Sequence, residues 1–223
     1  MIIAAFILNL LNTPINSNCD KIDEFIMQEI NKSDQFIGND FDCDQIIYDA
    51  CEIYYLKDRG YNDLAFMKIE NFYINHSQVN TYYEFVSGLK EGLIGNEKMA
   101  ITHYERSIEL DNNEQQIYWA RLALSELLWY DDSIMSKKLL DESIKINSNF
   151  WLAIQLRGLL LYNIDNDFVY SEYMAIPTKY RTSETFRILG DLTFNKMEIE
   201  ESERLYMQAL HLDDSNSNAL YGL

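Results

Sequence analysis

The fold is decided by two stretches that share one pattern, "AITHYERSIELDNN" at residues 100–113 and "SERLYMQALHLDDSN" at residues 202–216. Each carries a small, a large and a small residue at positions i, i+4 and i+7, followed by apolar residues and a polar exit. These triads are Ala100/Tyr104/Ser107 and Ser202/Tyr206/Ala209. Because such positions share one face of a helix, each triad predicts one buried helical stripe. The triads begin 102 residues apart, which is three times 34 and indicates a repeat.

A third triad and a set of preceding amphipathic segments extend the repeat. The triad is Ser136/Leu140/Ser143, and its polar exit is "NSN" at residues 147–149. Such runs of Asp, Asn and Ser stop one helix and cap the next. An amphipathic segment precedes each triad, so the repeating unit is a pair of helices, with pairs starting near residues 81, 117, 151 and 183. The third pair is predicted to be irregular and to lack a proper second helix, because Pro177 cannot continue a helix interior.

These residues resemble the tetratricopeptide repeat (TPR) family over residues 81–223. The matching residues of the last repeat, besides its triad, are Phe186, Leu189, Gly190 and Phe194. Asn112 and Asp214 depart from the family, which usually has proline at these positions. The resemblance implies an all-α fold, a right-handed superhelical solenoid of antiparallel helix pairs.

The predicted organisation has three parts. Residues 1–18 are a signal peptide or an apolar first helix, and residues 19–80 hold an N-terminal capping helix and a degenerate helix pair. Residues 81–223 hold TPR-like repeats at 81–116, 117–150, 151–182 and 183–216, with another repeat starting at 217. Because the apolar pattern still runs at Leu223, we expect the chain to be part of a longer protein or to expose its last helix.

The apolar run "IIAAFILNLL" at residues 2–11 leaves two alternatives open for localisation. As the apolar region of a signal peptide, it favours an exported or periplasmic protein. No Lys or Arg precedes it and no A-x-A site follows it, so the other alternative is the first helix of a cytoplasmic protein. A membrane span needs about 20 apolar residues, and the run is too short to form one.

The chain is strongly acidic, with 36 Asp and Glu against 18 Lys and Arg and a formal net charge of −18. This argues against nucleic-acid binding, since no basic stripe is present to neutralise phosphates. A solvated outer face accounts for the acidity. The three cysteines, Cys19, Cys43 and Cys51, form neither a disulfide framework nor a paired metal site.

The sequence contains no motif for catalysis, for metal binding or for nucleotide binding. The glycine-rich "GLKEGLIG" at residues 88–95 follows no predicted strand and carries no Lys-Ser/Thr pair. His76, His103 and His211 are far apart in the sequence, and the repeat register places the last two at outward-facing surface positions. The sequence therefore predicts no catalytic residue, no metal and no cofactor, and the protein is not expected to be an enzyme.

Repeat solenoids bind through the concave face that their first helices line. In the TPR family, inward positions of each repeat contact ligand peptides, and the resemblance transfers these positions to this chain. The predicted partner-binding residues are Tyr82, Phe85, Tyr118, Arg121, Trp129, Tyr162, Arg187, Phe194 and Asn195. Aromatic rings are typical interface anchors, and the arginine side chains suit a carboxylate. The alternative is that the rings pack between repeats and the arginines pair with local Asp and Glu.

The predicted function is a non-enzymatic protein–protein interaction module, a TPR-type adaptor or scaffold that holds a peptide or helix of a partner in its concave groove. The alternative is the sensory or scaffold region of a longer regulatory protein. Neither the identity of the protein or peptide partner nor the oligomeric state follows from the sequence.

Overall fold

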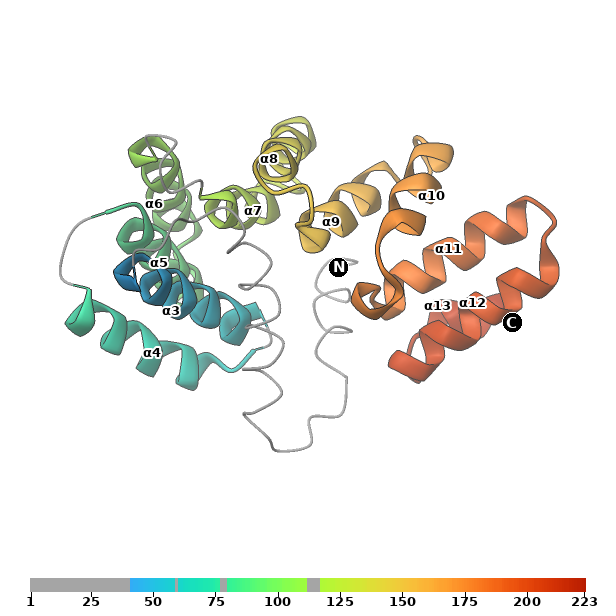
Figure 1. Cartoon of the computed structure of the whole chain (residues 1–223), viewed down its shortest axis with the longest axis horizontal. Coiled ribbons are helices and arrows are strands. Elements are labelled where there is room, and N and C mark those ends of the chain that lie inside the picture. The colour runs from blue at the N-terminus through green and yellow to red at the C-terminus, as the bar shows by residue number, and fades with distance from the viewer. Residues whose placement is uncertain (1–40, 59, 77–79, 112–116) are drawn as a thin grey trace. The chain divides into compact units, whose positions relative to one another are not determined.

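The computed structural model describes residues 41–223 apart from residues 59, 77–79 and 112–116. Within this part of the chain the regular secondary structure is helical (Figure 1). The alternatives for residues 1–18 and the capping helix predicted after them lie outside the described residues.

The helices follow one another in pairs. The described helices are α3 (Phe41–Asp58), α4 (Asn62–Asn75), α5 (Thr81–Leu93), α6 (Glu97–Leu110), α7 (Tyr118–Leu127), α8 (Ser133–Ile146), α9 (Trp151–Leu161), α10 (Asn166–Ala175), η1 (Thr178–Tyr180), α11 (Ser183–Asn195), α12 (Ile199–Leu212) and α13 (Ser217–Gly222). Consecutive helices pack as α3 with α4, α5 with α6, α7 with α8, α9 with α10, and α11 with α12 (Figure 1). The predicted all-α fold of antiparallel helix pairs is confirmed.

Polar side chains cap several of these helices at their N-termini. Asn216 accepts a hydrogen bond from the backbone N–H of Ala219 at 3.0 Å, as its place in the polar exit after α12 predicts. Thr182 caps α11 through the N–H of Thr185 in the same way. Each cap satisfies a backbone donor that the first turn of a helix leaves open, which explains where these helices begin.

The predicted triads are buried where the second helix of each pair faces the first. Tyr104 of α6 lies against Gly88 of α5, and Tyr206 of α12 lies against Gly190 of α11. A Cβ atom at Gly190 would lie 2.7 Å from the Tyr206 ring, which is closer than real side chains approach. The two glycines therefore make room for the tyrosine rings and allow the paired helices to pack closely.

The third pair keeps the same arrangement, so the prediction that it lacks a proper second helix is wrong. Val169, Tyr173 and Ile176 stand at positions i, i+4 and i+7 of α10 and its C-cap, and all three are buried. The Tyr173 ring lies against Gly158 of α9, where a Cβ atom would collide with it. The pattern is weak in the sequence because Val and Ile replace the small residues, and α10 is short because it ends before Pro177.

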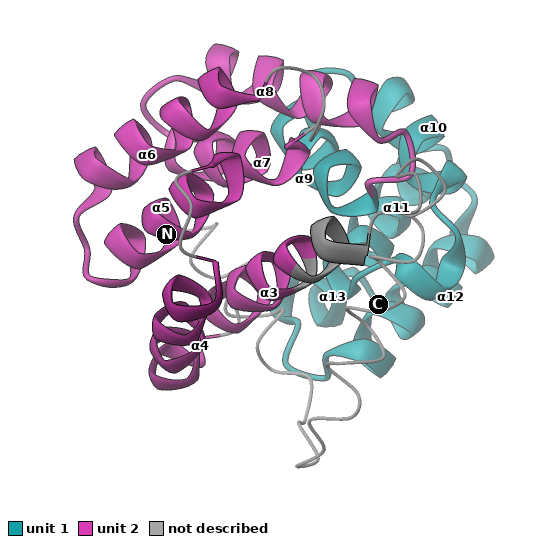
Figure 2. Ribbon diagram, turned by 60° about the vertical axis from the view of Figure 1, so that its left-hand side comes forward, with its two compact units in different colours: residues 1–16, 151–223 teal, residues 17–150 magenta. Residues whose placement is uncertain are grey.

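The described residues form two compact units, 41–150 and 151–223 (Figure 2). The first, called the N-terminal unit below, contains α3 to α8, and the second, the C-terminal unit, contains α9 to α13. Each has its own core of fully buried side chains, such as Phe85 and Leu140 in the first and Tyr173 and Leu189 in the second. The predicted binding residues are divided between the two units.

Candidate functional site

In the N-terminal unit, helix α3 packs against the aromatic side chains of two later helices. The Tyr54 ring of α3 contacts Phe85 of α5 and Trp119 of α7, with ring centroids 6.5 and 5.2 Å away. Tyr82 and Phe85 are only 3% and 0% exposed. Two of the predicted binding residues are thus buried in the core of this unit.

A hydrogen bond also joins α3 to the C-terminal end of α7. The hydroxyl of Tyr54 donates to Oε1 of Glu126, with 2.7 Å between the oxygens. Burial and the nearby charge of Asp58 raise the pKa of Glu126 to about 7, against the opposing effects of Lys57 and of the Tyr54 hydrogen bond. The acceptor of this bond therefore changes its charge near neutral pH.

The guanidinium group of Arg121 of α7 forms its contacts within the N-terminal unit. It donates a hydrogen bond to the carbonyl oxygen of Ile117 at 3.0 Å, and it lies 3.5 Å from the carboxylates of both Asp111 and Glu142. Its side chain is only 13% exposed. The positive charge of Arg121, which the sequence predicts to meet a partner's carboxylate, is therefore compensated by two carboxylates of the same chain.

The other predicted residues of this unit, Tyr118 and Trp129, are partly buried. The Tyr118 ring packs edge-on against Phe150, with ring centroids 4.7 Å apart. Part of each surface faces solvent, so a contact between these residues and a partner stays a prediction.

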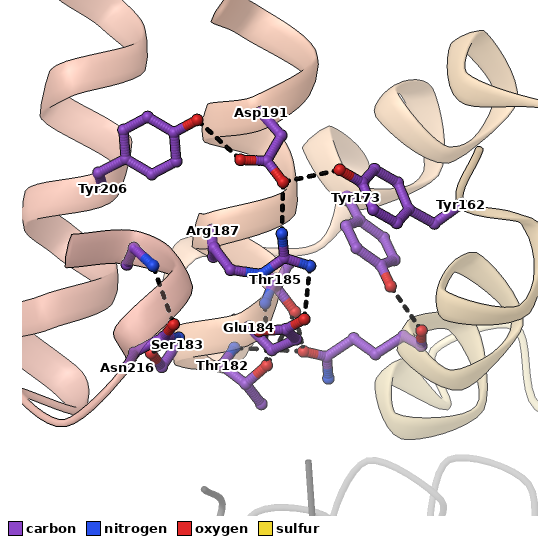
Figure 3. Close-up of polar contacts among 12 residues, drawn as sticks. Tyr162, Tyr173, Thr182, Ser183, Glu184, Thr185, Arg187, Asp191, Tyr206 and Asn216 are labelled. Atoms are coloured by element: carbon purple, nitrogen blue, oxygen red, sulfur yellow. Dashed lines mark hydrogen bonds and ion pairs between the residues drawn. The ribbon is translucent and has the colours of Figure 1, made fainter. Parts of the chain in front are cut away.

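In the C-terminal unit, Asp191 of α11 is the centre of a cluster of hydrogen bonds (Figure 3). Its Oδ2 atom accepts from the hydroxyl of Tyr162 at 2.7 Å, and its Oδ1 atom accepts from the hydroxyl of Tyr206, also at 2.7 Å. The guanidinium of Arg187 donates to Oδ2 as well. We call these four residues the Asp191 cluster; it joins the end of α9 to α11 and α12.

Arg187 is held between two carboxylates of its own helix. Besides Asp191, it donates to Oε1 of Glu184 at 2.5 Å, and its guanidinium lies 5.4 Å from the centroid of the Tyr162 ring. Burial alone lowers the pKa of Arg187, but the hydrogen bond to Glu184 and the charges of Glu184 and Asp191 outweigh it and raise the pKa. Arg187 therefore stays charged, and its charge is compensated inside the chain.

The phenols of the cluster remain hydrogen-bond donors at neutral pH. Burial, together with the hydrogen bond to Asp191, raises the pKa of Tyr162 to about 12. The same causes raise the pKa of Tyr206. Because Asp191 accepts from two phenols and one guanidinium, these hydrogen bonds fix the orientations of all four side chains.

A second set of hydrogen bonds, centred on Gln155 of α9, supports the beginning of α11. The backbone carbonyl of Gln155 accepts from the hydroxyl of Tyr173 at 2.6 Å. Its side-chain oxygen accepts from the hydroxyl of Thr185 and from the N–H of Thr182. Helices α9, α10 and α11 are thereby connected, which makes the base under the Asp191 cluster rigid.

The end of α11 and the turn after it expose apolar side chains. Phe194 is 49% exposed, Met197 81% and Ile199 50%; Asn195, the last of the predicted binding residues, is exposed beside them. Met197 also adopts a left-handed backbone with φ of 63°, which favours glycine over other residues. Gly95, at the same position of the first repeat, has φ of 79°.

Metal-binding clusters and membrane-spanning helices are absent from the part of the chain that the structure describes. No group of His, Cys, Asp or Glu there has the arrangement of a metal site, and no helix there is long and apolar enough to span a membrane. The prediction that His103 is a plain surface residue is wrong, since its Nδ1 atom lies 2.7 Å from Oε2 of the buried Glu84. This contact joins α6 to α5.

No protein-family model matches the chain, and no curated protein matches it in sequence. Solved structures do share its fold. MamA superposes with a TM-score of 0.51 at 17% identity, covering 73% of this chain and 95% of that chain. YrrB, described as a TPR protein with an unusual peptide-binding site, gives 0.51 at 15% identity, with 86% and 96% covered. TTC0263, a thermophilic TPR protein of Thermus thermophilus, gives 0.53 at 14% identity, with 77% and 92% covered.

These likenesses establish the fold. The chain has the TPR fold, in agreement with the resemblance seen in its repeat residues. At identities of 14–17%, the likeness carries no binding site from these structures to this one.

Proposed function

We propose that the protein is a non-enzymatic TPR-type adaptor or scaffold that binds a peptide or helix of a partner protein through one face of α11. We call this surface the α11 face and define it by the partly exposed Glu184 and Asp191, the buried Arg187 between them and the half-exposed Phe194, with Tyr162 packed beside them. The observation that carries the proposal is the half-exposed ring of Phe194, which stands next to the rigid Asp191 cluster.

The spacing of the α11 face supports the proposal. Arg187, Asp191 and Phe194 are separated by four and three residues, so they lie on one side of the helix. Exposed aromatic residues supply much of the binding energy of protein interfaces. A surface whose side chains are already held by hydrogen bonds loses little conformational entropy when a partner binds.

The remaining predicted residues differ in their exposure to solvent. Tyr118, Arg121, Trp129 and Asn195 keep some exposed surface and stay proposed contacts. Tyr82 and Phe85 are buried, so they are expected to meet a partner only where their covering helices move away.

Selection of random twelve-residue peptides displayed on phage, with the full chain as the target, tests the proposal. We expect enriched peptides whose affinity falls by about tenfold or more in Phe194→Ala, because the change removes the exposed ring. The matched control is Met207→Ala, which truncates a 56% exposed apolar residue of α12. Substitution of Arg187 is unsuitable here, because it would leave two carboxylates without their partner.

Both variants are expected to keep the circular dichroism spectrum and melting temperature of the parent, since neither side chain is buried. The proposal fails if no peptide is enriched, or if Phe194→Ala and Met207→Ala weaken binding equally.

A further inference from the structure

We infer that the partner segment is basic and carries Lys or Arg beside an apolar side chain. This inference rests on the proposed function and names the chemistry of the partner at the same α11 face. It comes from the charges of the C-terminal unit and from the contacts that these charges make.

The C-terminal unit has more acidic than basic side chains. Residues 151–223, all of which are described, contain eleven Asp and Glu and six Lys and Arg, a formal charge of −5 with histidine neutral. Each of the six cations has a partner inside the unit. Arg157 pairs with Glu172, Arg187 with Glu184 and Asp191, and Arg204 with Glu201; Arg181 bonds the carbonyls of Ile176 and Met174; Lys179 and Lys196 lie over the rings of Tyr180 and Tyr170.

An acidic partner is disfavoured at the centre of the α11 face. Arg187 lies between Glu184 and Asp191, so these three side chains together carry one negative charge. A carboxylate that approached Arg187 would have to displace one of these anions and would still face the other. Like charges brought together in a partly desolvated interface cost binding free energy.

A cation is favoured at the same place and at the turn that follows. The side chain of Asp191 keeps 24% of its surface exposed. Glu198 and Glu200 are exposed on the two sides of Ile199, and neither forms an ion pair with a cation of residues 151–223. A basic side chain next to Glu198 and Glu200 is attracted by two negative charges and meets the single positive charge of Lys196, which lies over the Tyr170 ring.

The apolar side chain of the partner segment is inferred from the exposed apolar residues between Asp191 and Glu200. Phe194, Met197 and Ile199, which lie close together in the sequence, each expose about half or more of their surface. A segment that combines apolar and basic side chains covers these residues and meets the carboxylates around them. A second copy of this chain is a poor occupant, because each copy carries a formal charge of −18.

The peptides selected on the full chain test this inference directly. We expect enrichment of Lys and Arg next to aliphatic or aromatic residues, and an affinity that falls as NaCl rises from about 50 to about 500 mM because salt screens charge pairs. A synthetic copy of the most enriched peptide is then titrated against two variants with the same change of charge. Glu198→Lys, at the start of α12, is expected to weaken binding about fivefold or more.

Asp214→Lys, an exposed position beyond the other end of α12, is the matched control and is expected to change affinity less than about twofold. Equal weakening by the two variants would show unspecific attraction to an acidic protein and would overturn the inference. Enrichment of acidic or uncharged peptides that still depend on Phe194 would overturn the inference and leave the proposed function standing.

Two further outcomes are distinct from these. Peptides that bind Phe194→Ala as well as the parent would overturn the proposed function itself. A dimer of the parent in analytical ultracentrifugation that Phe194→Ala dissociates would replace the basic peptide by a second copy, and so would also overturn the inference.

Discussion

The N-terminal and C-terminal units are built from the same helix pairs but differ in the burial of the aromatic residues of α5 and α11 that were predicted to bind a partner. In the first, Tyr82 and Phe85 of α5 are buried and the Tyr54 ring of α3 packs on Phe85. In the second, Phe194 of α11 is half-exposed and Met197 after it is largely exposed. Residues that the repeat places at inward positions thus become core or surface according to which other helix packs over them.

The largest expected effect is the loss of stability when the Tyr54 ring of α3, which covers Phe85, is removed. Tyr54→Ala removes a fully buried ring that contacts both Phe85 and Trp119, and it is expected to lower the free energy of unfolding of the N-terminal unit by about 3–5 kcal/mol. Hydrogen exchange read by mass spectrometry should show faster exchange in α3, α5 and α7. Phe194→Ala, on a half-exposed ring, is the control and should cost less than about 1 kcal/mol. Equal costs would contradict the contrast.

The next effect concerns pH and the bond between Tyr54 and Glu126. The pKa of Glu126 is about 7 in the folded chain and near 4.5 when unfolded, so its contribution to stability is full below about pH 4.5. This contribution is lost as the pH rises to about 7, and we expect a difference on the order of 1–3 kcal/mol between these limits.

Urea unfolding of the parent and of Glu126→Gln at several pH values measures this difference. The glutamine variant keeps an acceptor for Tyr54 and should lack this part of the pH dependence. Glu105→Gln, at an exposed site of α6, should keep it. A parent and a Glu126→Gln variant with parallel pH profiles would contradict the assignment.

A smaller effect probes the rigid base of the α11 face. Tyr206→Phe keeps the ring against Gly190 but removes the hydroxyl that donates to Asp191, which leaves one carboxylate oxygen without that donor. We expect a loss of about 1–2 kcal/mol in chemical denaturation. Tyr221→Phe, on a 96% exposed ring, should have no measurable effect. An equal loss of stability in both variants would contradict the view that the Asp191 cluster is preorganised by its hydrogen bonds.

The smallest effect concerns a turn that occurs once in each unit, after α5 and after α11. Met197→Gly relieves a left-handed backbone and should raise stability by about 0.5–1 kcal/mol, whereas Gly95→Met introduces the same strain and should lower stability by a similar amount. Thermal melts of the two variants check the signs. Met197→Gly is also expected to weaken peptide binding, since it removes an exposed apolar side chain. A destabilised Met197→Gly would mean that the methionine side chain supports the fold.

Sequence patterns predicted the helix pairs because the information is local. The triad Ser202, Tyr206 and Ala209 needs only the helical period to define a buried face. The pairing of Arg187 with Glu184 and Asp191 is equally local, since spacings of three and four residues bring side chains together on a helix. That spacing is the sequence signal that favours an internal pair over a free arginine.

The rest depends on contacts between distant parts of the chain. The carboxylates near Arg121 come from Asp111, before α7, and from Glu142 of α8, so no spacing within one helix indicates them. The bond from Tyr206 to Asp191 depends on how α12 is rotated against α11. The packing of α3 on α5 and α7 depends on tertiary burial, which a repeat pattern that starts at residue 81 does not contain.

The most direct test of where the partner binds is a titration of the full chain, labelled with ¹³C in its methionine methyl groups, with the most enriched peptide, followed by NMR. Met197 reports on the α11 face, while Met67, Met99 and Met135 report on exposed sites of the N-terminal unit. Single Met→Leu variants assign the signals. We predict that the Met197 signal shifts and that the other three stay unchanged. Shifts of Met67, Met99 or Met135 with an unmoved Met197 would contradict the account.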